Sequence, residues 1–187
     1  TNVQEVAKIS AASVAICKSD WDDSEVSFDF QESAVVSCRQ GFSLPKSYQK
    51  CVEEVSRRIS VLKGLEERNN RIFIDAYGLQ SELTPDVPDE QITLNRSDRE
   101  KDCQRLISYA IGCMMGRYSL DEPGLIYAHA GNVGFEPGRY ATFPADADGI
   151  VPITDELWFA DDAPSRIREF LRAVWGPDTL EENMAWL

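Results

Sequence analysis

The stretch that decides the fold is Arg105-Leu-Ile-Ser-Tyr-Ala-Ile-Gly-Cys-Met-Met-Gly-Arg-Tyr118. From Leu106 to Met115 its residues are apolar or small, a pattern typical of a helix that is buried on all sides. Ser108, Gly112 and Gly116 recur at every fourth position, so they share one face that another backbone can approach closely. A glycine inside a helix costs about 1 kcal/mol relative to alanine, so tight packing is the expected compensation. We therefore expect a central core helix in a helix-rich protein.

A second, longer helix is predicted from Lys46 to about Tyr77. Its apolar side chains keep a three-four spacing that is typical of the seam of a helical hairpin. They are Tyr48, Val52, Val55, Ile59 and Leu62. Gly78 is the expected C-terminal cap. The nearest candidate for an antiparallel partner is a first helix from Val3 to Lys18.

The connections between these helices also have local signals. Residues 19–24 (Ser-Asp-Trp-Asp-Asp-Ser) should end the first helix, with Trp21 as a core anchor, and residues 24–30 should form an extended link. Residues 79–94 contain two prolines and predict a rigid, ordered connection. Ser97 and Glu100 fit a capping box, which would start the core helix near residue 98 and let it run to Tyr118.

The chain changes character after Gly124, where glycine and small residues become frequent. Short strands are expected at Tyr140–Phe143 and Gly149–Ile153, and Asp161 or Asp162 is the expected cap of a following helix. Helices are expected at Leu157–Phe159, Pro164–Trp175 and Leu180–Leu187. The predicted fold is mainly α, a helical hairpin or bundle around the glycine-containing helix, with a small α+β or irregular C-terminal part. A domain boundary is predicted at residues 122–124, which gives a helical domain at 1–121 and a second part at 122–187.

The composition limits the possible functions. The 187-residue chain has a formal net charge of -13, so nucleic acid would repel it unless its cations cluster. Basic residues group modestly at residues 57–58, 68–71 and 96–105. The apolar runs are too short to cross a bilayer and there is no signal peptide, so a cytoplasmic location is expected. Five cysteines without a Cys-x-x-Cys pair and a single histidine predict reduced, mostly buried thiols and no zinc site.

Several blocks of the sequence, in order along nearly the whole chain, resemble the PglX family. The blocks are Ala15 to Phe30 (with Asp20-Trp-Asp and Ser27-Phe-Asp-Phe), Glu67-Arg-Asn-Asn-Arg-Ile-Phe-Ile-Asp-Ala-Tyr-Gly-Leu79, Glu82-Leu-Thr-Pro-Asp-Val-Pro88 leading to Ile92-Thr-Leu94, Leu106 to Asp121 with Pro123-Gly-Leu, Asp148-Gly-Ile-Val-Pro-Ile153, and Trp158 to Trp175. This family comprises the large adenine-specific DNA methyltransferases of the BREX phage-defence system, which are related to single-chain restriction-modification enzymes. The resemblance implies a fragment of a longer protein that transfers a methyl group from S-adenosylmethionine to adenine N6, with DNA and other BREX proteins as partners.

The motifs that such catalysis needs are missing from this sequence. There is no Asn/Asp-Pro-Pro-Tyr/Phe loop to hold a flipped base and no glycine-rich turn after a strand. Gly131-Asn-Val-Gly134 lacks the dinucleotide-type spacing and is interpreted as a loop. His129 has no nucleophile motif near it, and the carboxylates at residues 20–23 are better explained by a helix-ending turn. We therefore assign no catalytic, cofactor-binding or metal-binding residue, and expect the catalytic domain to lie elsewhere in the parent protein.

Six residues are candidates for nucleic-acid contact because their side chains are of types that bind bases and phosphates. They are Asn69, Asn70, Arg71, Arg117, Tyr118 and Arg139. The structural alternative for each is an arginine paired with a carboxylate or a half-buried tyrosine.

Two functions follow from these observations, and a third is weaker. The first is a non-catalytic fragment that supports DNA positioning or target recognition. The alternative is a protein–protein scaffold that docks the methyltransferase to partner defence proteins without touching DNA. A free-standing acidic DNA mimic would explain the charge but not the resemblance. A clustered basic face would favour DNA contact, and a continuous apolar groove would favour the scaffold.

Overall fold

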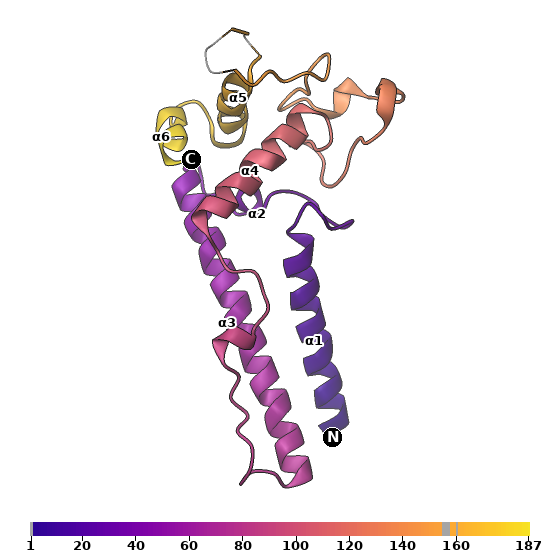
Figure 1. The fold of residues 1–187 in the computed structure, drawn as a ribbon, viewed down its shortest axis with the longest axis vertical. Coiled ribbons are helices and arrows are strands. Elements are labelled where there is room, and N and C mark those ends of the chain that lie inside the picture. Colours follow the sequence, from indigo (N-terminus) through magenta and orange to yellow (C-terminus); the bar gives the residue numbers. More distant parts are fainter. Residues whose placement is uncertain (1, 155–157, 160) are drawn as a thin grey trace. The chain divides into compact units, whose positions relative to one another are not determined.

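The computed structural model describes residues 2–154, 158–159 and 161–187. The regular structure of this described part is helical and includes no strand, which confirms the predicted mainly α class (Figure 1). The α-helices are α1 (Asn2–Asp22), α2 (Ala34–Ser37), α3 (Leu44–Tyr77), α4 (Arg99–Met114), α5 (Ala163–Trp175) and α6 (Leu180–Trp186). Short 3-10 helices are η1 (Asp89–Gln91), η2 (Ala130–Asn132) and η3 (Pro137–Arg139).

Contacts divide the chain into two compact units, each built from two separate segments. The first unit consists of Thr1–Asp22 and Val52–Ser97, and the second of Asp23–Cys51 and Asp98–Leu187. The helix α3 contributes to both. The boundary expected at residues 122–124 falls inside the second unit, and a division of the chain at that point stays a prediction.

In the first unit, α1 runs antiparallel to the part of α3 that belongs to this unit (Figure 1). The Arg68 guanidinium lies 2.5 Å from a Glu5 carboxylate oxygen and so ties the two helices together. Ile16 of α1 and Ile59 of α3 pack against the same buried cluster, which is centred on Leu62. The predicted hairpin and its partner helix are therefore confirmed.

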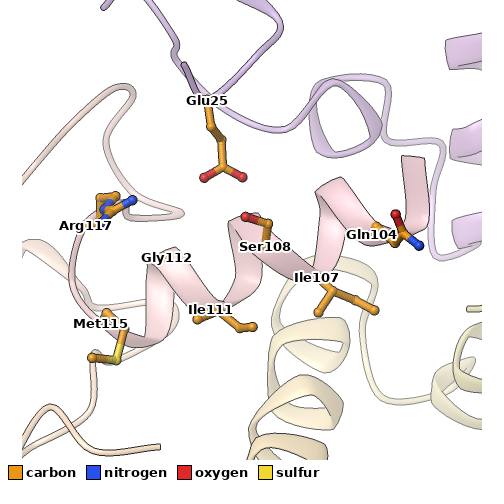
Figure 2. A pocket seen from close by; sticks show the side chains of 8 residues that line it. All are labelled: Glu25, Gln104, Ile107, Ser108, Ile111, Gly112, Met115 and Arg117. Atoms are coloured by element: carbon orange, nitrogen blue, oxygen red, sulfur yellow. The ribbon is translucent and has the colours of Figure 1, made fainter. Parts of the chain in front are cut away.

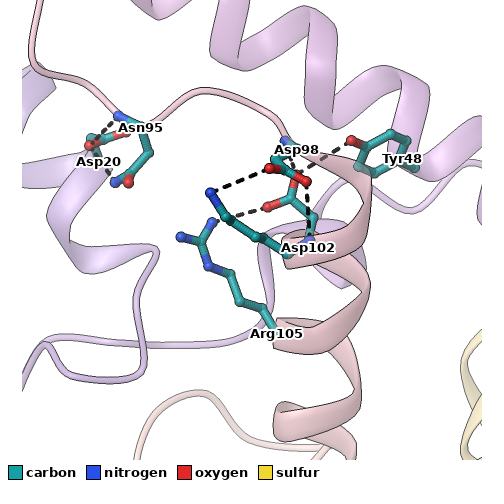
Figure 3. Close-up of polar contacts among 7 residues, drawn as sticks. Asp20, Tyr48, Asn95, Asp98, Asp102 and Arg105 are labelled. Carbon is teal, nitrogen blue, oxygen red and sulfur yellow. Dashed lines mark hydrogen bonds and ion pairs between the residues drawn. The ribbon is translucent and has the colours of Figure 1, made fainter.

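The segment between α3 and α4 completes the core of the first unit. Val87, Ile92 and Leu94 bury their side chains against Leu62. The backbone N–H of Asn95 donates to Asp20 Oδ2 at 3.1 Å, and its side-chain amide donates to the same atom at 2.8 Å (Figure 3). The expected ordered connection is confirmed, because residues far apart in the sequence anchor it, and its one helical stretch is the short η1.

The ends of α1 and α3 test two further predictions. The helix α1 continues through Asp22, and Trp21 is 59% exposed, so its predicted role as a core anchor is wrong. The physical reason is local, since an ion pair of 2.6 Å between Lys18 and Asp22 supports one more helical turn. The helix α3 ends as expected at Gly78, whose φ of 69° turns the chain while Leu79 N–H donates to the carbonyl of Ile74 at 3.0 Å.

The second unit has the larger core, formed by α4, α5, α6 and the start of α3. Tyr109 and Met114 of α4 pack with Phe170 and Trp175 of α5, and all four are almost fully buried. The Trp175 indole N–H donates to Ser47 Oγ at 2.9 Å. The side-chain oxygen of the buried Asn183 accepts from Leu44 N–H, also at 2.9 Å, and joins α6 to the first turn of α3.

The helix α4 differs from its prediction in where it starts, where it ends and how deeply it is buried. Its N-cap is Asp98 and not Ser97: the Asp98 side chain accepts from Lys101 N–H, and the Asp98 N–H donates to Asp102 at 3.0 Å (Figure 3). It ends at Met114, because Gly116 turns the chain with a φ of 71°. Only one side of α4 is buried, so the expectation of burial on all sides is wrong.

The glycine face of α4 is close-packed, but its neighbour is a ring and not a backbone. A Cβ atom added to Gly112 would lie 2.5 Å from Cδ2 of Tyr118. The aromatic ring of Tyr118 therefore folds back over the helix end and fills the space that the missing side chain leaves. Ser108, which was expected to share this face, is exposed.

The strands expected at Tyr140–Phe143 and Gly149–Ile153 are wrong, because their backbone groups bond to side chains and not to a neighbouring strand. Thr142 N–H donates to Asp121 at 2.9 Å, and Gly149 N–H donates to Asp146 at 2.9 Å. The helices α5 and α6 are confirmed. Asp162 caps α5 by accepting from Ser165 N–H at 2.9 Å. In the expected helix at residues 157–159, Leu157 lies outside the described residues and the remaining two are not helical.

The five cysteines are free thiols that differ in their exposure. Cys51, Cys103 and Cys113 are buried free thiols, whereas Cys17 is exposed and Cys38 is half-buried. Within the described residues, His, Cys, Asp and Glu side chains do not gather in groups of three or more that could hold a metal ion. None of the helices described combines the length and apolar character needed to cross a membrane.

Candidate functional site

The first group of predicted DNA contacts lies on α3 in the first unit. The Asn70 amide donates to the carbonyl of Pro85 at 3.2 Å and so holds the connection that follows α3. The Asn69 side-chain oxygen is buried and has no hydrogen-bond partner among the described residues. Arg71 is exposed, and no ion pair is found for it in the described part of the chain. Of these three side chains, Arg71 is therefore the one available to a phosphate.

The other predicted contacts lie in the second unit, where two of them have structural roles. Tyr118 is 4% exposed, and its ring stacks on Tyr109 with 5.3 Å between ring centroids. Burial raises the pKa of its hydroxyl, which interacts with Glu25 and Arg117. Arg139 pairs with both carboxylate oxygens of Glu122, and this hydrogen bonding lowers the pKa of Glu122. Arg117 itself is exposed. DNA contact by any of the six residues stays a prediction.

Many of the basic side chains are already matched to carboxylates within their own unit. In the first unit Glu54 pairs with two arginines, and in the second unit Asp102 pairs with Arg105 at 3.0 Å. The further pairs are Lys63–Asp89, Arg68–Glu5, Lys101–Asp98, Arg139–Glu122, Arg166–Glu169 and Arg168–Glu181. Such pairing removes much of the positive potential that the basic groups in the sequence suggested.

The carboxylate of Asp102 has several partners within the second unit. It accepts from the Asp98 N–H, binds Arg105 and lies 3.5 Å from the Tyr48 hydroxyl (Figure 3). Burial, followed by the charge of Asp102, raises the pKa of Tyr48 to about 12. The cluster holds the start of α4 against α3 inside the second unit, so its function is structural.

A groove on the exposed side of α4 was not predicted from the sequence. Its volume is about 350 Å³ and its lining is mostly apolar (Figure 2). The residues that line it are Glu25, Gln104, Ile107, Ser108, Ile111, Gly112, Met115 and Arg117. Ile111 is 38% exposed and Met115 is 46% exposed, so large apolar side chains face solvent here. The signal was present in the sequence as an apolar row at every fourth residue, but it was interpreted as part of the core.

The buried thiols offer no nucleophile. Burial raises the pKa of Cys51 to about 12, and it raises the pKa of Cys113 to about 12 as well. Both groups therefore stay protonated near neutral pH, and a protonated thiol does not attack a substrate.

Two known proteins match this chain along nearly all of its length. The adenine-specific methyltransferase BrxX of Escherichia coli O9:H4 (strain HS) is 35% identical over the whole chain, which covers 17% of that protein. The chain is similar from end to end to one segment of this methyltransferase. The adenine-specific methyltransferase PglX of Lacticaseibacillus casei (strain Zhang) is 33% identical over 98% of the chain, which covers 16% of that protein. No family model matches the chain. The resemblance to PglX-type methyltransferases that the sequence blocks indicated is thus confirmed, and the chain spans about one sixth of the length of these relatives.

Proposed function

We propose that this chain works as a non-catalytic helical segment of a PglX-type adenine-specific DNA methyltransferase, and that its task is to hold other protein parts in place. The parent reaction would be methyl transfer from S-adenosylmethionine to adenine N6, with cofactor and base bound outside this segment. The similarity to BrxX and PglX supports the assignment to such a protein.

The observation that favours a scaffold over DNA contact is the pairing of the cations. DNA binding requires lysines and arginines that are free to neutralise phosphates. Here Arg68 and Arg105, each from a group that the sequence marked as basic, and Arg139, one of the candidate contacts, bind carboxylates instead. The surplus of acidic residues, with a net charge of -13, adds repulsion.

Fluorescence anisotropy of the 187-residue chain with a labelled duplex tests this proposal. We expect no binding at either low or near-physiological salt. Binding that is strong at low salt and falls steeply as salt rises would overturn the scaffold role, because it would show that clustered cations overcome the net charge.

DNA positioning is the second candidate function, and the exposed Arg71 is the observation that favours it. If this arginine contacts a phosphate in the longer methyltransferase, Arg71→Ala should weaken DNA binding and reduce its salt dependence by about one counterion. Arg68→Ala is the matched control. Arg68 lies about one helical turn before Arg71 on α3, but its side chain is bound to Glu5. Equal DNA affinity for both variants and the parent protein would contradict DNA positioning by Arg71 and would leave the scaffold as the better supported function.

A further inference from the structure

The groove on α4 has the surface relief of a helix-packing site. Ile107, Ile111 and Met115 repeat at every fourth residue and form a ridge of large apolar side chains. Beside it runs a second row with the same spacing, Gln104, Ser108 and Gly112, which is low at the small Ser108 and is closed at Gly112 by the ring of Tyr118. Two helices pack when the ridge of one enters the groove between such rows on the other, most often at a crossing angle of about -50°.

The ends and sides of the groove carry one charge of each sign. Figure 2 shows the carboxylate of Glu25 pointing toward α4 near Ser108 and Gly112, and Arg117 lying beyond the C-terminal end of the helix. A DNA strand does not fit this pattern, because its phosphates need several cations and gain nothing from an apolar floor. A polypeptide that presents an apolar stripe edged by polar residues is complementary to it, because Glu25 and Arg117 lie beside the apolar row and both interact with the Tyr118 hydroxyl.

We propose that this groove, formed by Ile107, Ile111, Met115, Ser108 and Gly112, receives an amphipathic helix from another region of the same methyltransferase. This inference rests on the proposed function and specifies the partner that the scaffold holds. The relatives are about six times longer than this chain, so the helix would come from the remainder of such a protein. A helix within the same polypeptide docks at a high effective concentration, so a groove of this modest size is sufficient.

Cysteine labelling compares the groove in two contexts. Ser108→Cys places a thiol in the groove at an exposed position, and Glu100→Cys places one on the same helix outside the groove. Both variants are made in a Cys17→Ser background, in the 187-residue chain and in the longer methyltransferase. Maleimide labelling is followed by mass spectrometry and normalised to the denatured protein.

The expected result is rapid labelling of Ser108→Cys in the 187-residue chain and labelling at least about tenfold slower in the longer methyltransferase. Glu100→Cys should be labelled at similar rates in both. Adding Ile111→Arg should restore fast labelling of Ser108→Cys in the longer protein, because the arginine expels the docked helix. The melting temperature of the 187-residue chain should hardly change with Ile111→Arg, since this side chain is already partly in solvent.

Three outcomes would overturn the inference. Equal labelling of Ser108→Cys in both contexts would mean that the groove stays open. Protection that appears in the 187-residue chain and grows with its concentration would identify a second copy as the occupant. Protection that appears only when a DNA duplex is added would identify DNA. The anisotropy measurement is independent of these results, so the groove can fail while the scaffold role stands.

Discussion

Single polar residues with several partners hold the second unit together. Asn183 is fully buried, yet its side chain bonds to Leu44 N–H, the Phe42 carbonyl and Thr179. Ser47 is fully buried as well and binds both Trp175 and Gln40 N–H. Buried polar groups that are satisfied in this way fix which helix faces meet, because any other arrangement leaves them without partners.

The cap of α5 gives a direct test at the residue scale. Asp162→Ala should lower the free energy of unfolding by about 0.5–2 kcal/mol, because Ser165 N–H loses its acceptor. Asp161→Ala is the matched control, since Asp161 is exposed and lies one residue before the cap. Urea denaturation followed by circular dichroism measures both. An equal loss in the two variants would contradict the assigned cap.

The thiols give a second test. Cys17 should react with iodoacetamide in the folded chain, whereas Cys51 and Cys113 should react only when denaturant opens the second unit. Their pKa values of about 12 reflect burial, so both the thiolate fraction and the access of the reagent are low. Mass spectrometry after timed alkylation measures the order. Labelling of Cys113 as fast as that of Cys17 would contradict the burial of Cys113 on the inner side of α4.

Sequence patterns predict well which types of residue cap a helix, but they predict poorly which residue in the sequence is the cap. They named Asp161 or Asp162 for α5, and Asp162 is the cap. For α4 they named Ser97, but Asp98 is the cap, because both residue types accept from backbone N–H groups and the register of the first turn decides between them. That register depends on the hydrogen bond from Asp98 N–H to Asp102, which short-range rules do not include.

At the scale of elements, the two helical glycines should respond to substitution in opposite ways. Gly112→Ala should destabilise the protein by about 1–3 kcal/mol, because the new methyl group collides with the Tyr118 ring. Gly64→Ala in α3 has nothing within 4 Å of the added Cβ and should stabilise it by about 0.5–1 kcal/mol through helix propensity. Thermal melts of the two variants measure the signs. Stabilisation by Gly112→Ala would show that Tyr118 does not pack there.

Helix existence was predictable from the sequence, but helix burial was not. The spacing of apolar residues correctly gave α3, α4, α5 and the partner of α3. It could not show that Ile111 and Met115 face solvent, since an apolar row on a helix looks the same in sequence whether the core covers it or not. The groove was missed for that reason. The false strands have a different cause, because Asp121 and Asp146 accept hydrogen bonds from backbone N–H groups of the segments that were expected to be strands.

At the scale of the whole molecule, the two units should differ in stability. The buried cluster of the first unit is small and centres on Leu62, whereas the core of the second unit includes Tyr109, Phe170 and Trp175. We expect amides of α1 to exchange through an opening of lower free energy than amides of α4. Native-state hydrogen exchange at rising urea concentration measures this difference. Identical opening energies and urea dependence for both helices would mean that the chain unfolds as one cooperative block.

The discontinuous make-up of the units sets an order of events on the ribosome. Residues 23–51 emerge early, but their partners in the second unit begin only at Asp98 and extend to the last residue. The first unit is complete once Ser97 has left the exit tunnel. During synthesis the side chains of Phe30, Val35 and Leu44, which the finished second unit buries, therefore stay uncovered after the first unit has formed, and we expect this interval to be the one most exposed to aggregation.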